Sequence, residues 1–318
     1  MRRIFAAALL YLAALICHVR AVIFYSTGDP TFNTSAPTGS LSGSGWQWVG
    51  NWEGFAGTPI GPNCFLAARH VGGNVGDAFV FGGVSYTTTA FFDDTVTDLR
   101  ICQVSGAFPT WAPIYRGSGE VGQSLVVFGM GLSRGSSVVV GKNPAGWLWG
   151  GNGGTLRWGQ NTINSVVDGG SYWGQLLYAL FNSSGNPDQC QLAVGDSSGP
   201  VFINDGSGWQ LAGIAAAVDG PFYTTIGGSG FDAALFDARG LYYIDGNGDW
   251  DLISGRSPVP SGFYATQVSV RAAWIDSIVQ AQDNSTSEPL FSGAQTALFA
   301  VGLLGVGAVA LRRRAKEA

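Results

Sequence analysis

Short apolar runs alternate with turn residues over most of this chain, which is the pattern of an all-β protein. Runs rich in β-branched residues recur, for example at Asp77–Phe81, Ser124–Phe128 and Ser137–Val140. A helical pattern is clear only near the C-terminus, where residues 270–280 place Trp274, Ile275 and Ile278 on one face. We therefore expect many short strands separated by turns, followed by one helix.

Both ends of the chain carry an apolar segment next to arginines. Residues 4–16 follow Arg2 and Arg3, which predicts a signal peptide over residues 1–21 with cleavage after Ala21. Residues 296–311 precede three arginines, so residues 294–318 are expected to form an apolar anchor helix or sorting segment, joined by a linker at 283–293. The ends together predict an exported protein, at the cell surface, in the outer envelope or outside the cell.

Composition narrows the function further. The chain has 49 glycines, 13% aromatic residues and only 12% charged residues, which suits a compact β protein with many turns. Its 21 Asp and Glu outnumber its 16 Lys and Arg, giving a formal net charge of −5. An acidic, exported protein is not expected to bind nucleic acid.

One hexapeptide, Gly195–Pro200, is the strongest pointer to chemistry. Its Gly-Asp-Ser sequence places Ser197 on a tight turn, where neighbouring backbone N–H groups can face a developing oxyanion. A nucleophilic serine needs a general base, and His70 is the only histidine after residue 18. His70 directly follows an apolar run, Cys64–Ala68, that reads as a buried strand.

A carboxylate must hold the histidine in the correct tautomer. Asp98 is the best candidate because an alternating strand pattern, residues 99–104, begins immediately after it. Asp93 and Asp94 are nearby rivals, but Thr95 and Thr97 separate them from that strand. The order histidine, aspartate, serine differs from the serine, aspartate, histidine order of α/β-hydrolases.

These three blocks in this order resemble the chymotrypsin-like serine proteases, and bacterial secreted members in particular. The similarity extends over about residues 45–282, with residues 22–44 as an N-terminal lead-in. It includes Trp209–Ile214 and Gly262–Val268, which resemble two late strands of that family. The resemblance implies an all-β fold of two six-stranded antiparallel barrels of the chymotrypsin type with a C-terminal helix.

The resemblance also implies an activity, serine endopeptidase on protein or peptide substrates through an acyl-enzyme. His70, Asp98 and Ser197 would be the catalytic residues, and the N–H groups of Gly195 and Ser197 the oxyanion hole. In the family, the aspartate before the serine pairs with a cation. Here that residue is Asp196, with Arg69 and Arg157 as candidates by charge.

The resemblance places the substrate pocket at four positions, namely Gln191, Ala216, Val218 and Gly262. A neutral Gln191 at the pocket floor argues against a preference for arginine or lysine there. Val218 stands near a position that is often glycine, so the pocket is expected to accept small or medium apolar side chains. Ala216 departs from the family pattern, which has a serine supporting the aspartate at that point.

Three cysteines follow residue 21: Cys64, Cys102 and Cys190. In the resembled fold the strands of Cys64 and Cys102 are neighbours, so these two could form a disulfide in an oxidising compartment. The alternative is that both are buried thiols packed as small hydrophobic residues.

No cofactor is expected, with one weak candidate for a calcium site. Four alternating residues of a glycine-rich turn, Asp245, Asn247, Asp249 and Asp251, carry the oxygen ligands that calcium prefers. The position of the glutamate that would complete an EF-hand loop is Arg256. An Asx-rich surface turn is the alternative interpretation.

The C-terminal tail resembles the bacterial PEP-CTERM sorting signal, which has a Pro-Glu-Pro motif, an apolar helix and an arginine cluster. Here the motif is reduced to Ser287-Glu288-Pro289. The resemblance implies a sorting enzyme as a partner, and the alternative is a plain membrane anchor.

A different class of function also fits parts of the sequence: an inactive protease fold that serves as a surface adhesion or binding module. Ser198 in place of the family's glycine and Ala216 in place of its serine motivate this alternative. So do five tryptophans that could bind glycans from glycine-rich loops, namely Trp46, Trp48, Trp52, Trp147 and Trp149. A structural matrix protein is a third option, but the chain lacks the internal repeats that it would need.

Overall fold

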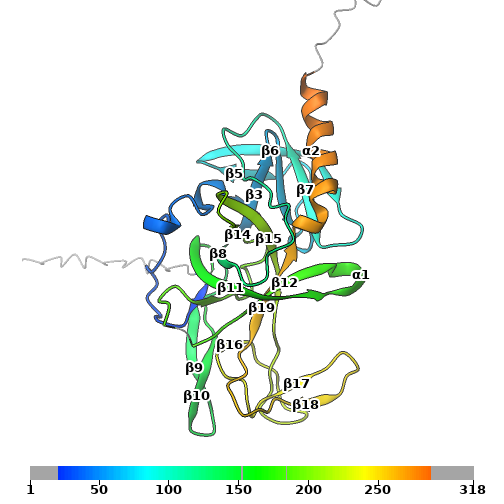
Figure 1. The fold of residues 1–318 in the computed structure, drawn as a ribbon. Helices are drawn as coiled ribbons and strands as arrows, with labels where there is room; N and C mark the ends of the chain where they lie inside the picture. The colour runs from blue at the N-terminus through cyan, green and yellow to red at the C-terminus, as the bar shows by residue number, and fades with distance from the viewer. Residues whose placement is uncertain (1–20, 152, 184, 288–318) are drawn as a thin grey trace, which may run out of the picture. The chain divides into compact units, whose positions relative to one another are not determined.

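The computed structural model describes residues 21–151, 153–183 and 185–287. Most of their regular structure is β-strand, and two sheets close into barrels (Figure 1). The first barrel has the order β2-β3-β4-β7-β6-β5. Its strands are β2 (Gly50–Trp52), β3 (Phe55–Gly61), β4 (Cys64–Ala68), β5 (Ala78–Phe81), β6 (Val84–Asp93) and β7 (Leu99–Val104).

The second barrel has the order β11-β12-β19-β15-β14-β8 and is also antiparallel throughout. Its strands are β8 (Ser124–Gly129), β11 (Arg157–Asp168), β12 (Gln175–Leu180), β14 (Pro200–Asn204), β15 (Trp209–Val218) and β19 (Gly262–Gln267). The expected pair of six-stranded antiparallel barrels is therefore confirmed.

Smaller elements extend this frame. A three-stranded sheet contains β9 (Arg134–Val140), β10 (Asn143–Trp149) and β16 (Ala233–Leu235), and β17 (Tyr242–Ile244) pairs with β18 (Trp250–Leu252). The short helix α1 spans Gly170–Trp173. The predicted C-terminal helix is present as α2, Ala272–Ser287.

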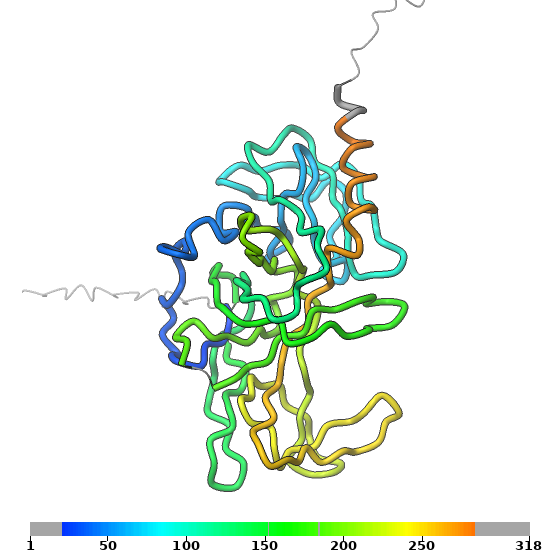
Figure 2. The backbone as a smooth tube through the Cα atoms, in the orientation of Figure 1, coloured from blue at the N-terminus to red at the C-terminus, as the bar shows by residue number. Residues whose placement is uncertain are grey.

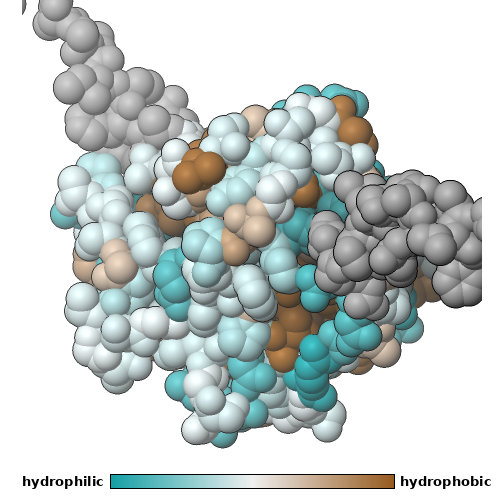
Figure 3. Space-filling view, turned by 90° about the horizontal axis from the view of Figure 1, so that it is seen from above, coloured by the Kyte–Doolittle hydropathy of each residue, from teal (hydrophilic) through white to brown (hydrophobic). Residues whose placement is uncertain are grey.

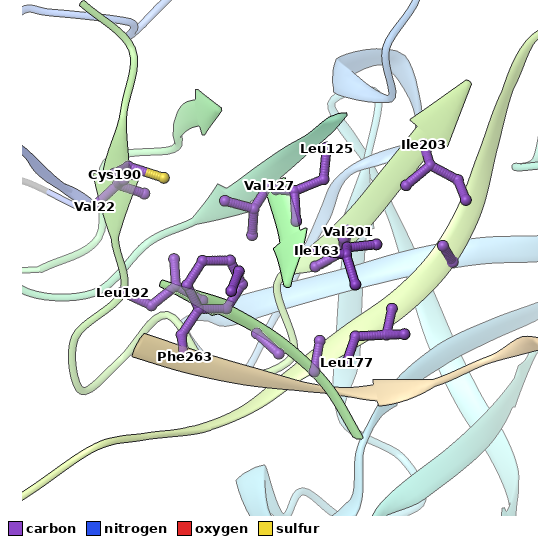
Figure 4. Packing of buried hydrophobic residues seen from close by; sticks show 14 of the residues in the cluster. Val22, Leu125, Val127, Ile163, Leu177, Cys190, Leu192, Val201, Ile203 and Phe263 are labelled. Carbon is purple, nitrogen blue, oxygen red and sulfur yellow. The ribbon is translucent and has the colours of Figure 1, made fainter. Parts of the chain in front are cut away.

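Residues 22–44, expected as a lead-in, pack into the second barrel. Strand β1 (Ile23–Phe24) pairs with β13 (Cys190–Gln191), and Figure 2 shows this first, blue part of the chain beside green segments of that barrel. Val22 and Phe24 belong to the barrel's apolar core with Leu125, Val201 and Phe263 (Figure 4). The folded unit therefore begins well before residue 45.

A second apolar cluster joins the two barrels. It contains Leu66 and Leu99 from the first barrel and Phe128, Phe202 and Ile214 from the second, all fully buried. Burial of this shared surface favours one relative position of the barrels, because most of its residues lose contact with water only when the barrels meet. On the molecular face in Figure 3, hydrophobic residues appear in separate small groups among polar ones.

The predicted signal peptide and the apolar C-terminal segment lie outside the described residues, except for Ala21. Within the described residues no helix has the length and apolarity that a membrane crossing requires.

Candidate active site

His70 lies where strand β4 ends and a short 3-10 turn, Arg69–Val71, begins. Its Nδ1 lies 2.5 Å from Asp98 Oδ2, and its backbone N–H donates to Asp98 Oδ1 at 3.0 Å. A carboxylate can only accept, so Nδ1 carries the proton and Nε2 is left as the acceptor. The tautomer is therefore the one that a general base needs.

Asp98 is fully buried and immediately precedes strand β7. Its carbonyl accepts the N–H of Arg69 at 2.7 Å, which couples its position to the histidine turn. The loop before it is held by buried Asp94, whose carboxylate binds the Arg271 guanidinium with two contacts of 2.6 Å and the Thr97 hydroxyl at 2.6 Å. The rival Asp94 is thus a structural anchor for the loop that carries Asp98.

Ser197 comes from the second barrel and meets His70 from the first. Its Oγ lies 2.8 Å from His70 Nε2, across 127 residues of sequence. Trp173 of helix α1 packs edge-on against the imidazole, with ring centroids 5.9 Å apart. Nothing in its local sequence, a Gly-Ser-Tyr-Trp-Gly turn, identifies Trp173 as a neighbour of the histidine.

The turn around Ser197 leaves two backbone donors available. Amides of Asp196, Ser198 and Gly199 donate to backbone carbonyls within the turn or on β15. By contrast, among the described residues the N–H groups of Gly195 and Ser197 have no acceptor. Gly195 has φ +90°, a backbone conformation that an L residue adopts only with strain. The predicted oxyanion donors are therefore free to bind a ligand oxygen.

Ser198 occupies the position where a glycine was expected, with φ +66° and no exposed surface. Its Oγ accepts the N–H of Ala68, two residues before His70, at 3.0 Å. A left-handed backbone costs a non-glycine residue about 1–2 kcal/mol, and a hydrogen bond of this kind contributes about 1 kcal/mol. This hydrogen bond thus offsets much of the backbone strain at Ser198. It also connects the turn that carries Ser197 to strand β4, which ends before His70.

Asp196, the residue before the nucleophile, is buried. Its carboxylate accepts N–H groups from Gly131 at 2.7 Å and Ala193 at 2.8 Å, and a third from Val22. Burial nevertheless raises the pKa of Asp196 to about 7. Arg157 lowers that pKa slightly through its charge, while its guanidinium binds carbonyls of the lead-in, including that of Ala21 at 2.8 Å. The other candidate, Arg69, binds the carbonyl of Asp94.

A pocket of about 190 Å³ opens beside Ser197. Of the four expected pocket residues, Ala216 and Val218 line it, together with Trp149 and Leu192. The lining residues Ala215 and Ala217 are also small and apolar. Ladder pairing between β14 and β15 ends at Ile214, and Ala215 still exchanges backbone hydrogen bonds with Ser198 and Gly199, so this edge of β15 is unpaired only from Ala216 onward in the described residues.

Gln191 and Gly262 lie outside that lining. Gln191 is buried, with its side-chain amide donating to Ser261 Oγ at 3.3 Å and its Oε1 accepting the N–H of Leu192. Gly262 donates its N–H to the Asp219 carboxylate and lies against Tyr178. The backbone of Gln191 pairs with Ile23 of the lead-in.

Cys64 and Cys102 are free, buried thiols in the structure, which is the second of the two alternatives, and no disulfide joins them. Their strands β4 and β7 are neighbours as expected, but Cys102 is opposite Phe65 and Cys64 is opposite Gln103. Side chains one position apart in register point to opposite faces of a sheet. Cys64 packs between the barrels and Cys102 inside the first barrel, and burial raises the pKa of Cys64 to about 12.

The candidate calcium segment forms the turn between β17 and β18. Asp245 Oδ1 accepts the N–H groups of Asn247 and Asp249 at 2.9 and 2.8 Å, and Asp251 binds the Tyr243 hydroxyl. These contacts are those of the Asx-rich turn that was the alternative interpretation. No group of three or more His, Cys, Asp or Glu side chains in the described residues is placed to hold a metal.

The five tryptophans considered for glycan binding are buried or half-buried. Trp52 is fully buried against Phe65, and Trp46 and Trp48 pack on Phe128 and Phe202. The rings of Trp46, Trp48 and Trp52 are therefore used in packing the barrels, whereas Trp147 packs against Phe181 and Trp149 lines the pocket beside Ser197.

Similar proteins were found only among solved structures. No protein-family model and no curated protein sequence matches the chain. A solved structure of neuropsin, a serine protease expressed in the limbic system of mouse brain, has 14% identity and a TM-score of 0.45, covering 73% of this chain and 94% of neuropsin. Kallikrein-related peptidase 10 has 15% identity and a TM-score of 0.44, covering 77% of this chain and 100% of its own. At this level of similarity, any function must be argued from the site itself.

Proposed function

We propose that this protein is a serine endopeptidase that cleaves protein or peptide substrates through an acyl-enzyme. The observation that carries the proposal is the continuous hydrogen-bonded series from buried Asp98 through His70 to Ser197, with contacts of 2.5 and 2.8 Å. Two unpaired backbone N–H groups on the same turn complete the requirements for acyl transfer.

In the proposed mechanism, Ser197 Oγ attacks the scissile carbonyl carbon while His70 Nε2 accepts its proton. The carbonyl oxygen becomes an oxyanion and accepts the N–H groups of Gly195 and Ser197. Asp98 stabilises the imidazolium, which then protonates the leaving amine as the acyl-enzyme forms. Water then attacks the acyl carbon while His70 Nε2 accepts its proton. The imidazolium returns that proton to Ser197 Oγ as the bond between Oγ and the acyl carbon breaks, which releases the acid product. The small apolar pocket beside Ser197 favours substrates with small or medium apolar side chains next to the cleaved bond.

We place this enzyme outside the cytoplasm, on the basis of the predicted signal peptide over residues 1–21 and the apolar tail over 294–318. A bacterial surface protein with a PEP-CTERM-like tail, anchored in a membrane or processed by a sorting enzyme, is the corresponding proposal for its location. Both ends can be tested by sequencing the termini of the mature protein from its native host.

Labelling with a fluorophosphonate probe tests the proposed nucleophile. The full-length protein should be labelled covalently, and Ser197→Ala should abolish labelling because, in the part of the chain that the structure describes, no other hydroxyl is hydrogen-bonded to His70. Ser198→Ala is the matched control, since the Ser198 hydroxyl is buried and occupied by the Ala68 N–H. Loss of labelling in Ser198→Ala alone would assign the nucleophile to that residue. A folded protein that is never labelled would favour the binding module instead.

The raised pKa of Asp196 predicts a pH-dependent stability. Because the folded pKa of about 7 exceeds the usual aspartate pKa of 3.8 that applies in the unfolded chain, the folded state binds the extra proton, and stability falls as pH rises from about 4 to 7. Between pH 5 and pH 8 the unfolding free energy should fall by about 2–3 kcal/mol more in the wild type than in Asp196→Asn. Urea unfolding at the two pH values measures this difference.

Cleavage after Ala21 supplies an internal control for that experiment. A chain that begins at Val22 carries an α-ammonium group where the full-length chain has an amide N–H beside Asp196. The positive charge would keep the carboxylate ionised, so this form should lose the extra pH dependence. Equal pH dependence in the cleaved, uncleaved and Asp196→Asn proteins would contradict the assignment.

A further inference from the structure

A second, larger cavity lies next to the pocket beside Ser197. Its volume is about 630 Å³, and Val218 lines both cavities. Most of its wall comes from the segment between β15 and β19, which includes the β17–β18 hairpin (Figure 1). The proposed acyl-transfer mechanism uses none of these residues.

The cavity wall contains a carboxylate held by two tyrosines. Asp219 accepts the hydroxyls of Tyr178 and Tyr264, each at 2.6 Å, and the N–H of Gly262 at 2.7 Å. The two tyrosine rings are stacked, with centroids 4.6 Å apart. Burial and the neighbouring carboxylate raise the pKa of both tyrosines, so each keeps the hydroxyl proton that it donates to Asp219.

This anion lacks a cation of its own. In the described part of the chain no Lys, Arg or His nitrogen lies within 4.0 Å of Asp219. A half-buried carboxylate without an ionic partner attracts a positively charged ligand group, and the attraction is stronger than it would be in bulk water. Aromatic rings in the same wall add to that attraction, because ring faces carry negative potential.

The rest of the lining suits an aliphatic stem. Phe222, Ile244, Leu252 and Ile253 contribute apolar surface, and Tyr223 and Tyr243 add two further aromatic rings. Ile244 and Leu252 are 42% and 51% exposed, so the apolar surface is open to an incoming ligand. Lysine and arginine side chains bury an aliphatic stem while presenting a charged head, which matches an apolar wall with one anion.

We propose that this cavity is an accessory substrate site that binds a lysine or arginine side chain of the polypeptide while a different residue occupies the pocket beside Ser197. The proposal rests on the proposed endopeptidase function. Three features favour a cationic side chain as the occupant. They are the Asp219 carboxylate, which has no cationic partner in the described residues, the tyrosine rings, and the continuity with the Ser197 pocket through Val218.

Binding can be measured without turnover. Calorimetry with Nα-acetyl-arginine amide and its neutral analogue Nα-acetyl-citrulline amide, on the full-length Ser197→Ala protein, should show at least tenfold tighter binding of the arginine amide. Adding Asp219→Asn should remove that preference, since the amide keeps a hydrogen-bonding oxygen but has no charge. Adding Asp205→Asn instead, an equal charge change in the exposed turn between β14 and β15 outside the lining, should leave the preference intact.

Kinetics on the protein with intact Ser197 test the role in substrate selection. Peptides that carry one arginine at each position around a fixed apolar cleavage residue are compared with citrulline versions of the same peptides. At one position the arginine version should have at least tenfold higher kcat/KM than the citrulline version, and Asp219→Asn should abolish that ratio.

Two results would overturn the accessory site. The first is equal binding of the arginine and citrulline amides, a comparison that does not depend on whether any variant folds. The second is an arginine preference that Asp219→Asn does not change in a protein whose unfolding curve matches the parent. Absence of fluorophosphonate labelling is a separate failure, which affects the endopeptidase proposal and leaves the binding comparison readable.

Discussion

Replacement of His70 by alanine is expected to lower kcat by about 10⁵- to 10⁶-fold, with little change in KM. His70 Nε2 is the only base within hydrogen-bond distance of Ser197 Oγ in the described residues. Without it the hydroxyl must attack while still carrying its proton, and the leaving amine has no acid. Only the oxyanion donors and the substrate pocket then remain to promote the reaction.

The double variant sharpens this prediction. Ser197→Ala should cost about as much as His70→Ala, and combining them should cost little more, because the two groups act as one unit. Kinetics with a fluorogenic peptide whose sequence suits the apolar pocket measure all three variants. Strictly multiplicative losses would contradict the proposed proton transfer, and so would a His70→Ala protein that retains a tenth of its activity.

Replacement of Asp98 by asparagine is expected to lower kcat by about 10⁴-fold. Asp98 Oδ2 accepts the proton on His70 Nδ1 and keeps Nε2 as the acceptor. An asparagine can turn its NH₂ group toward Nδ1, which places the imidazole proton on Nε2 and blocks transfer from Ser197. Asparagine and aspartate have nearly the same size and shape, so this variant changes the tautomer of His70 while the packing around residue 98 stays the same.

Asp93→Asn is the matched control for that measurement. Asp93 lies on the neighbouring strand β6 and forms a half-exposed ion pair with Arg100 at 2.6 Å. Its replacement removes the same charge close to the site but touches neither His70 nor Ser197, so kcat should stay within about threefold. Comparable losses in the two variants would mean that local charge, and not the tautomer, governs the rate.

The general architecture could be predicted from the sequence because the local signals agree with one another. Short β-branched runs with frequent glycines indicated strands, and the periodicity near Trp274 indicated the final helix, which the structure places at Ala272–Ser287. The structure brings His70, Asp98 and Ser197 together. Their residue types and their order in the chain had predicted that these three side chains form one site. Their catalytic role stays a prediction until the kinetics are measured.

Other features depended on register and long-range contacts that no local pattern contains. Of the two alternatives for Cys64 and Cys102, the structure has the free thiols, because a one-residue offset between β4 and β7 turns the side chains to opposite faces. The backbone pairing of Gln191 with Ile23 was not predicted either, because the lead-in had not been assigned to the barrel. Both outcomes follow from strand pairing between distant segments.

The sequence by itself determined the strand-rich fold class, the terminal helix and the three reactive side chains, since each of these leaves a mark within a few neighbouring residues. The tertiary structure alone decided that the Val22 N–H donates to Asp196, and that the Ser198 hydroxyl accepts an N–H from the strand before His70. It also decided that Asp219 lies in a tyrosine-lined cavity with no cationic partner among the described residues. These contacts join residues 41 or more positions apart, and their partners are selected by barrel closure and packing of the shared core.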